Sequence, residues 1–527
     1  MDWLLPIISG LILTLLFPPF SIGLLVPFAI VPLVWSLHGK TWKEAFRIGF
    51  LAGLVHFGTL IWWIAPTIAT YGNLPLWASW PVVGLLACYL AVYPAVWSVF
   101  VADSMRKGHR IILLTLSAPA AWALLEWARG HFLSGFPWGS LAYSLIHVPS
   151  LIQTADIYGP YGLSFLIVLT NMIVWDLLEK TRGCCNLSGI KGRRAAAGEA
   201  ALLALGVAFL WLYGDTRIKK IAETDNRYPA AYAAAIQGSI PQNEKWDPAF
   251  QQKTISTYEN LSAEAVSSAH IPTGKNDIKY PILVWPETAA PFYFQDQGPL
   301  SRQVAALASK LKAIIVFGSP AYNIAKTGGR TAYLNSAYIL GPDGATLGRY
   351  DKVHLVPFGE YMPFGWVTAW AKDYLPTAGE FMAGKSVAPL SFKGIHIGVL
   401  ICFESIFPKL GRDLVRGGAN LIAVITNDAW FGRTGAPYQH EEMAILRAVE
   451  TRRWVIRAAN TGVSSIISPW GETVSRTSIF HPCYTSGIVR LRDGETFFAR
   501  HGGQWPPVLS IITIILIFLY PKKEVPK

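Results

Sequence analysis

The sequence of 527 residues contains little charge and few cysteines. Charged side chains make up 15% of it, whereas 52% of its residues are hydrophobic, and its mean hydropathy is positive. Soluble proteins typically carry about 25% charged residues, so this composition excludes an ordinary soluble enzyme and also a disordered chain. It predicts membrane spans together with one sizeable domain.

The cysteines form neither a metal-binding pattern nor a disulfide framework. They number five, at positions 88, 184, 185, 402 and 483. Their spacing fits no metal site, and an odd count argues against systematic pairing. We expect no metal, no soluble cofactor and no bond between Cys402 and Cys483.

Acidic residues are fewer than basic ones, 33 against 45, which gives a formal net charge of +12. Nucleic-acid binding requires an exposed basic face with interleaved aromatic side chains. Lys and Arg instead gather in short loops between apolar runs, a pattern typical of membrane topology. The sequence therefore predicts no nucleic-acid partner.

Eight apolar runs approach the roughly 20 residues needed to cross a bilayer. They lie at 3–20, 22–38, 48–66, 77–101, 111–128, 157–177, 197–214 and 506–520. The first run has no basic leader, so we interpret it as a retained span rather than a signal peptide. Basic residues fall in every second loop, and such loops face the cytoplasm. Both termini are therefore predicted to be cytoplasmic, with residues 215–505 on the outer side.

Between about 228 and 492 the pattern changes to short β-rich runs separated by helical stretches. The expected strands are 230–237, 282–284, 313–317, 336–340, 394–401, 421–426, 455–459 and 487–491, and the expected helices are 249–269, 299–312, 406–416 and 440–453. This alternation is typical of an α/β domain. We divide the chain into a membrane domain of about seven helices (1–214), an outer α/β domain (215–505) and a C-terminal span with a short tail (506–527).

Cys402 follows a strand-like run and precedes a helix. A strand-to-helix corner exposes a nucleophile beside backbone N–H groups. The alternative is a free cysteine packed as a small hydrophobic side chain, which describes most single buried cysteines. Local context alone leaves both interpretations open.

Glu287 and Lys352 are two further candidates at strand ends. A half-buried carboxylate such as Glu287 reaches a pKa useful for a general base, although it could also be a rim carboxylate bonded to the backbone. Lys352 could stabilise a developing oxyanion, or be an ordinary surface lysine. Acid, amine and thiol together favour a covalent catalyst.

Several longer motifs carry a family resemblance. They are Trp-Pro-Glu ending at Glu287, Lys-Val-His-Leu-Val-Pro-Phe-Gly-Glu starting at Lys352, Cys-Phe-Glu-Ser starting at Cys402 and Thr-Asn-Asp-Ala-Trp-Phe-Gly starting at Thr426. The chain resembles the carbon–nitrogen hydrolase (nitrilase) superfamily and, more narrowly, bacterial apolipoprotein N-acyltransferases. The resemblance covers essentially the whole chain.

This resemblance implies an αββα-sandwich domain with a Glu287, Lys352 and Cys402 triad. It further implies acyl transfer in two halves, from a phospholipid such as phosphatidylethanolamine to Cys402, and then to the α-amino group of a diacylated apolipoprotein. Such an enzyme is expected in the inner membrane as a multi-pass protein with a periplasmic catalytic domain. A monomer is sufficient for one active site.

The same resemblance implies supporting roles for five other residues. Glu360 and Glu404 are expected to orient Lys352 and the nucleophile corner, with surface or backbone capping as the alternative. The Phe403 N–H is expected to help hold the oxyanion, and Asn335 and Trp246 to lie around the site. His354, His396 and His440 sit in strand-like runs or at a helix start, and we interpret them as structural.

Aromatic residues from Phe358 to Trp366, followed by Trp370, suggest a lid that dips into the lipid interface. A local hydrophobic cluster under a long loop is the alternative. Two other functions compete with acyl transfer. One is a membrane-tethered amidase that passes its acyl group to water, and the other is a binding protein with a degenerate site.

Overall fold

The computed structural model describes residues 3–72, 74–107, 111–181, 190–324, 331–363, 381–502 and 505–519. The chain forms two compact units. The helical unit comprises Met1–Pro66, Pro75–Ile218 and His501–Lys527, and the sandwich unit comprises Thr67–Leu74 and Lys219–Arg500. The lid residues Phe364, Trp366 and Trp370 lie outside the described residues.

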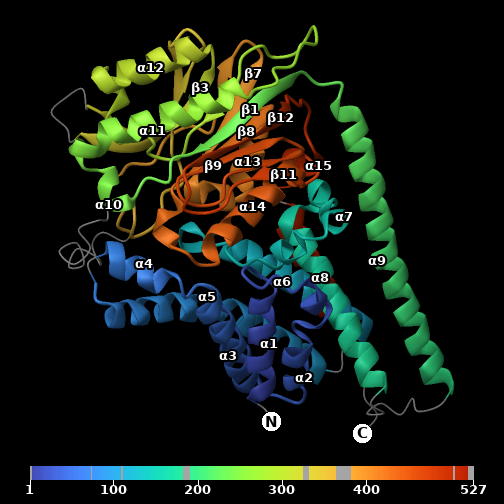
Figure 1. Ribbon diagram of the computed structural model, residues 1–527. Coiled ribbons are helices and arrows are strands. Elements are labelled where there is room, and N and C mark those ends of the chain that lie inside the picture. The colour runs from blue at the N-terminus through green and yellow to red at the C-terminus, as the bar shows by residue number, and fades with distance from the viewer. Residues whose placement is uncertain are drawn as a thin grey trace. The chain divides into compact units, whose positions relative to one another are not determined.

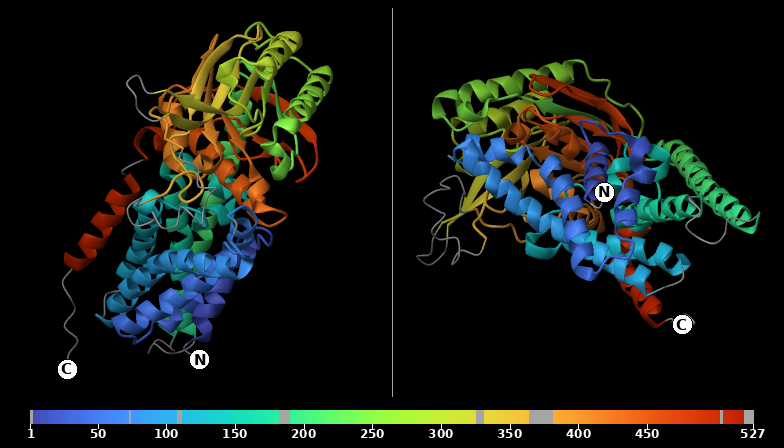
Figure 2. Two further views of the ribbon diagram at one scale, coloured as in Figure 1. Left: turned by 90° about the vertical axis from the view of Figure 1, so that its left-hand side faces the viewer. Right: turned by 90° about the horizontal axis from the view of Figure 1, so that it is seen from below.

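The helical unit is built from apolar helices of unequal length. Its main helices are α1 (Leu4–Leu15), α2 (Val31–Ser36), α3 (Trp42–Leu60), α5 (Leu76–Arg106), α6 (Ile111–Arg129), α8 (Ala155–Thr181) and α16 (Trp505–Leu519), and two more, α4 (Ile64–Tyr71) and α9 (Ile190–Asp225), continue into the sandwich unit. The C-terminal helix α16, red in Figure 2, packs along α6 although the two are far apart in sequence.

Among the described residues, three helices are long and apolar enough to cross a membrane. They are α5, α8 and the Ala196–Asp225 part of α9, and a fourth span results if α3 and α4, bent by 52°, count as one. The helices at the other expected spans do not meet both criteria among the described residues, so a total of eight remains a prediction. The run 3–20 yields only the 12 residues of α1, about 18 Å of helix, because Pro18 and Pro19 follow it.

The sandwich unit contains two six-stranded sheets. The first has the order β12-β1-β2-β3-β4-β5 and the second the order β11-β10-β9-β8-β7-β6. In the first sheet the strands are β1 (Ala230–Gln237), β2 (Ile282–Val284), β3 (Ile314–Asn323), β4 (Ala332–Leu340), β5 (Thr346–Asp351) and β12 (Cys483–Arg490). In the second they are β6 (Leu390–Phe392), β7 (Ile395–Ile401), β8 (Leu421–Thr426), β9 (Val455–Ala459), β10 (Ser465–Ile467) and β11 (Thr473–Arg476).

The sheets pack face to face, and helices cover their outer sides (Figure 1). Alternate residues of a strand point to opposite faces. In β1, Ala231, Ala233 and Ala235 enter the core between the sheets, whereas Tyr232 and Ala234 enter the core below the helices. Helices α11 (Pro248–Ser267) and α12 (Pro299–Leu311) cover the first sheet, and α13 (Pro408–Arg416) and α14 (Ala436–Thr451) cover the second. The expected αββα sandwich is confirmed.

Parallel strands at the centre of each sheet determine where functional residues gather. β1, β2 and β3 run parallel in the first sheet, and β7, β8 and β9 run parallel in the second. The carboxyl ends of parallel strands meet at one edge of a sheet, where open α/β folds place their ligands. Glu287 follows β2 and Cys402 follows β7, so both lie at such an edge.

We expect Trp285→Ala to destabilise the sandwich unit by about 3–5 kcal/mol. Trp285 is fully buried, stacks on Tyr258 with ring centroids 5.0 Å apart and donates to Ser262 Oγ at 2.9 Å. Thermal unfolding of the full-length protein in detergent, followed by circular dichroism, provides the measurement. The control is Val474→Ala at an exposed position of β11, where we expect a change below about 0.5 kcal/mol. Equal thermal midpoints of the two variants would contradict the stabilising role of Trp285.

Candidate active site

Three predicted residues meet in the sandwich unit at the ends of strands from both sheets. Lys352 follows β5 directly, Cys402 follows β7 directly, and Glu287 comes three residues after β2. All three are buried, with exposures of 6% for Glu287, 1% for Lys352 and 9% for Cys402. Lys352 Nζ lies 3.6 Å from Glu287 Oε1, and the charges of both residues act on the Cys402 thiol.

The carboxylate of Glu287 is held on both oxygens. Oε1 accepts a hydrogen bond from Asn335 Nδ2 at 2.7 Å, and Oε2 accepts one from the backbone N–H of Asn427 at 3.0 Å. These two hydrogen bonds fix the direction in which the carboxylate points. Glu287 is therefore an oriented carboxylate in a dry site, as a general base must be.

The ammonium of Lys352 sits between two carboxylates. Its Nζ lies 2.9 Å from Glu360 Oε1 and 2.8 Å from Glu360 Oε2, with Glu287 on its other side. Burial alone lowers the pKa of Lys352, but the negative charges of Glu360, Glu287 and Cys402 outweigh it and raise the pKa above its usual range. Lys352 is thus a fixed cation at any physiological pH.

Cys402 occupies the corner between β7 and a short 3₁₀ turn, Cys402–Ile406. Its φ of +53° is unusual for a residue other than glycine, and such backbone conformations cluster at functional sites. Burial first, and then the charge of Glu287, raise the pKa of the Cys402 thiol, while Lys352 opposes this. The resting sulfur is therefore a neutral thiol that needs a base before it can attack.

Glu404 connects the strand end that carries Lys352 with the corner that carries Cys402. Its Oε1 accepts from Val353 N at 2.7 Å, His354 N at 3.1 Å and the Tyr350 hydroxyl at 2.9 Å. Its Oε2 accepts from Ile401 N at 2.8 Å. Burial raises the pKa of Glu404 to about 7, although these hydrogen bonds and the charge of Lys352 oppose the rise.

A buried polar cluster supports the corner from behind. His440 Nε2 lies 3.2 Å from the Cys402 carbonyl oxygen and 2.9 Å from Ser405 Oγ. On its other side, Nδ1 lies 3.0 Å from Asp428 Oδ1, and Arg457 donates to Asp428 Oδ2 at 2.6 Å. His440 thus contacts the backbone at Cys402, and its structural role stays a prediction.

Three further residues were predicted to lie around the site: Asn335, Phe403 and Trp246. Asn335 donates to Glu287 and to Glu360. The Phe403 ring packs on Phe407 with centroids 5.1 Å apart. The Trp246 side chain is 50% exposed, so its role stays a prediction.

Sequence reasoning missed two groups that contact Glu287 directly. One is the Asn427 backbone N–H, and the other is the Lys245 ammonium, which donates to the Glu287 carbonyl oxygen at 2.9 Å. The motifs that hold Asn427 and Lys245 were visible, but nothing in their spacing indicated contact with Glu287. The described residues contain no group of three or more His, Cys, Asp or Glu side chains suited to a metal ion, and Cys402 and Cys483 are free thiols.

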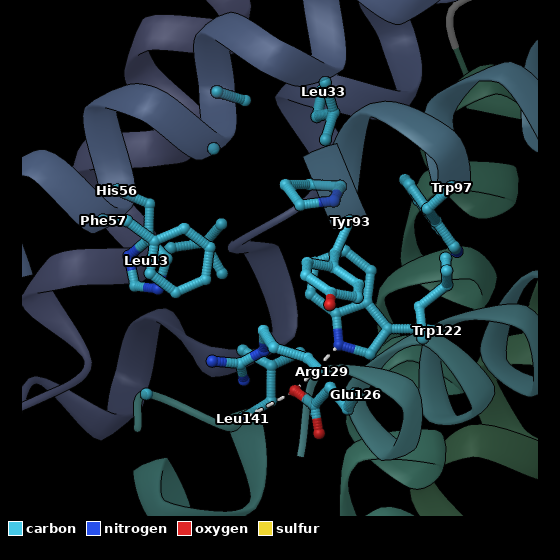
Figure 3. A pocket seen from close by; sticks show the side chains of 15 residues that line it. Leu13, Leu33, His56, Phe57, Tyr93, Trp97, Trp122, Glu126, Arg129 and Leu141 are labelled. Carbon is cyan, nitrogen blue, oxygen red and sulfur yellow. Dashed lines mark hydrogen bonds between the residues drawn. The ribbon is translucent and has the colours of Figure 1, made fainter. Parts of the chain in front are cut away.

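A separate cavity lies among helices of the helical unit, and its lining includes no residue of the sandwich unit (Figure 3). Glu126 Oε1 accepts there from Trp122 Nε1 at 3.0 Å and from Leu141 N at 2.9 Å. Arg129 donates to the carbonyl oxygens of Phe136 and Trp138. These bonds tie α6 to the loop that follows it.

Comparison with known proteins identifies two matching families. The apolipoprotein N-acyltransferase N-terminal domain matches residues 9–173, and the carbon-nitrogen hydrolase family matches residues 232–481. The chain is 42% identical to the apolipoprotein N-acyltransferase of Geobacter metallireducens over 502 residues, which cover 95% of this chain and 92% of that relative. It is 32% identical to that of Methylococcus capsulatus over 512 residues, with coverages of 96% and 93%.

Solved structures of lower similarity also match. A carbon-nitrogen hydrolase from Helicobacter pylori shares 17% identity at a TM-score of 0.36, and the match covers 56% of this chain and 99% of that one. An amidase from Nesterenkonia sp. shares 18% identity at a TM-score of 0.36, with coverages of 51% and 92%.

We expect Gly318→Ala to slow the alkylation of Cys402 by iodoacetamide between about tenfold and 100-fold. A Cβ atom at Gly318 would lie 2.4 Å from Thr288 N and 2.7 Å from Glu287 Cα, so the segment that holds Glu287 must move. Peptide mass spectrometry against time gives the rate. In Gly487→Ala the added Cβ meets only Ile466 Cγ2 at 3.6 Å, and this control should react normally. An unchanged rate in Gly318→Ala would contradict the dependence on Glu287.

We expect Glu404→Gln to destabilise the sandwich unit at about pH 8, although the two side chains have nearly the same shape. The amide places a donor against the N–H and O–H donors around Glu404, and each buried group left unpaired costs about 1–3 kcal/mol. The measurement is the thermal midpoint as a function of pH. The pKa of Glu404 is raised to about 7, so the wild-type side chain itself binds a proton below that pH. The difference in thermal midpoint between wild type and Glu404→Gln should therefore become smaller below about pH 7.

The matched control for this variant is Glu472→Gln. Glu472 is exposed and accepts a hydrogen bond from Trp470 Nε1. Its neutralisation should leave the midpoint unchanged across the same pH range. A Glu404→Gln protein as stable as the wild type at about pH 8 would show that the four hydrogen bonds contribute little.

Proposed function

Because the chain belongs to the apolipoprotein N-acyltransferase family, we propose that it transfers a fatty acyl chain from a membrane phospholipid to the α-amino group of a diacylglyceryl-cysteine at the N-terminus of apolipoproteins. The observation that supports this reaction best is the buried arrangement of Glu287, Lys352 and Cys402. It provides a base, a fixed cation and a neutral thiol within one dry site.

In the first half-reaction, Glu287 takes the proton of the Cys402 thiol while the sulfur attacks the ester carbonyl carbon of the donor. The carbonyl oxygen becomes an oxyanion, which the Lys352 ammonium and the Phe403 N–H stabilise. Collapse breaks the bond to the glycerol oxygen, and this oxygen leaves with the proton from Glu287. The products are a thioester at Cys402 and a lysophospholipid.

In the second half-reaction, the free α-amino group of the acceptor attacks the thioester carbonyl. Glu287 removes one proton from the attacking amine, and the sulfur departs and is reprotonated. An amide forms from a thioester, which is a downhill step. The cycle is of the ping-pong type, and it involves no metal or soluble cofactor.

The proposed setting follows from the substrates. A two-tailed donor requires access from the bilayer, and the apolar helices of the chain suit such an environment. We place the protein in the inner membrane with several spans, both termini in the cytoplasm and the sandwich unit in the periplasm. Phosphatidylethanolamine is the proposed donor, and a monomer suffices.

The test is mass spectrometry of purified full-length protein incubated with phosphatidylethanolamine. We expect the Cys402 peptide to gain a fatty acyl mass that hydroxylamine removes and that a diacylated lipopeptide amine discharges as an N-acyl product. Glu287→Gln should reduce the initial rate of acylation on the order of 100-fold or more. Cys402→Ala should form no adduct.

Cys483→Ala is the matched control, because Cys483 is a second free thiol in the same unit. Its adduct and product yields should equal those of the wild type. A thioester that only water discharges would favour an amidase-like hydrolase instead. The lack of any adduct with phospholipid would point to a binding protein.

A further inference from the structure

Lys245 is a buried cation at the active site that the proposed reaction does not yet use. It ends the short helix α10 (Gln242–Lys245), and only 1% of it is exposed. An ammonium carries three N–H donors. Within the described part of the chain, its single hydrogen bond goes to the Glu287 carbonyl oxygen at 2.9 Å.

This ammonium also acts on the reacting sulfur. Its electrostatic partners are Glu287 and Cys402, the proposed base and nucleophile. No carboxylate oxygen lies within 4 Å of its Nζ among the described residues, so no direct ion pair consumes its charge. The positive charge of Lys245 therefore acts on Glu287 and Cys402.

The charges of the site explain why a second cation is present. Glu287 and Glu360 contribute two negative charges, whereas Lys352 contributes one positive charge. An uncompensated charge in a buried site is costly. Glu404 adds a third carboxylate next to Lys352. Lys245 therefore helps to compensate the negative charge that moves from Glu287 to the sulfur and then to the oxyanion.

We propose that Lys245 is a positioning residue of acyl transfer, which fixes the Glu287 segment through its carbonyl oxygen and stabilises the negative charge that forms at Cys402. The inference rests on the proposed roles of Glu287 and Cys402. It adds a second lysine to the site and assigns a function to the segment just before Trp246. The two lysines differ in their task, because Lys352 pairs with carboxylates and Lys245 does not.

The two lysines also differ in their titration. Burial lowers the pKa of Lys245 to about 8, while the charges of Glu287 and Cys402 partly oppose this. Lys352 and Asp428 act on Cys402 in turn. Below about pH 8 Lys245 is charged and its effect is present, and above that pH the effect is lost. Neighbouring Glu244 pairs with the exposed Lys253.

The experiment compares alkylation of Cys402 by iodoacetamide in full-length wild type, Lys245→Met and Lys245→Arg between about pH 6 and pH 10. Near pH 6.5 the wild type should react about tenfold faster than Lys245→Met, the equivalent of one pKa unit of the thiol. The ratio should fall clearly towards pH 10, where Lys245 is neutral and only its hydrogen bond to the Glu287 carbonyl oxygen remains. Lys245→Arg stays charged at every pH in this range and should keep its advantage.

If Lys245 had only a structural role, the ratio of the alkylation rates of wild type and Lys245→Met would be independent of pH. That result would overturn the proposal. Lys253→Met is the matched control, since it removes an exposed lysine near α10, and its profile should follow the wild type. If neither Lys245 variant folds, the wild-type rate must still rise by clearly less than tenfold per pH unit around pH 8, and a full tenfold rise there would also overturn the proposal.

Alkylation requires no lipid, so it separates this inference from the proposed function. If the alkylation rates of wild type and Lys245→Met converge with rising pH in a protein that never forms an acyl adduct, the role of Lys245 is supported and phospholipid is refuted as the donor. Normal acylation together with a pH-independent ratio of the two alkylation rates would refute the role of Lys245 and leave the proposed function standing.

Discussion

The site depends above all on the carboxylate of Glu404, which joins the two sheets where their strands end. Lys352 follows a strand of the first sheet and Cys402 a strand of the second, and the hydrogen bonds of Glu404 reach the backbone of both segments. Each bond to a buried N–H also satisfies a group that would otherwise be costly to bury. One buried side chain thus holds the segment that carries the amine against the corner that carries the thiol.

Burial and charge act against each other throughout this site. Burial raises the pKa of the Cys402 thiol and lowers that of Lys245, whereas neighbouring carboxylates raise the pKa of Lys352. The lowered pKa of Lys245 costs stability, whereas the raised pKa of Lys352 means that its neighbours stabilise the charged ammonium. The folded protein tolerates these shifts because the opposing charges lie within one cluster. Asn335 and Asn427 complete the hydrogen bonds of Glu287 there.

The sequence allowed much of the sandwich to be predicted, because continuous apolar runs such as Ala230–Gln237 and Leu421–Thr426 became strands with those bounds. Their place at strand ends made Glu287, Lys352 and Cys402 candidates, and the family resemblance selected them as a triad. Contacts such as that between Glu287 and Asn427, 140 positions apart, depend on how the two sheets pack and leave no local pattern. The expected run 3–20 is longer than helix α1, which ends at Leu15 ahead of Pro18 and Pro19, because hydropathy takes no account of the N–H donor that proline lacks.

The neutral state of the Cys402 thiol bears on how the proposed reaction would favour transfer over hydrolysis. A thiolate is the reactive form of cysteine, so a buried sulfur with a raised pKa stays inert until Glu287 removes its proton. Glu287 is itself held in one orientation by Asn335, Asn427 and Lys352. Water competes poorly where the site is dry. A sulfur whose thiol has a raised pKa is also a poor leaving group. In the proposed reaction, a thioester at Cys402 would therefore persist until an amine attacks it.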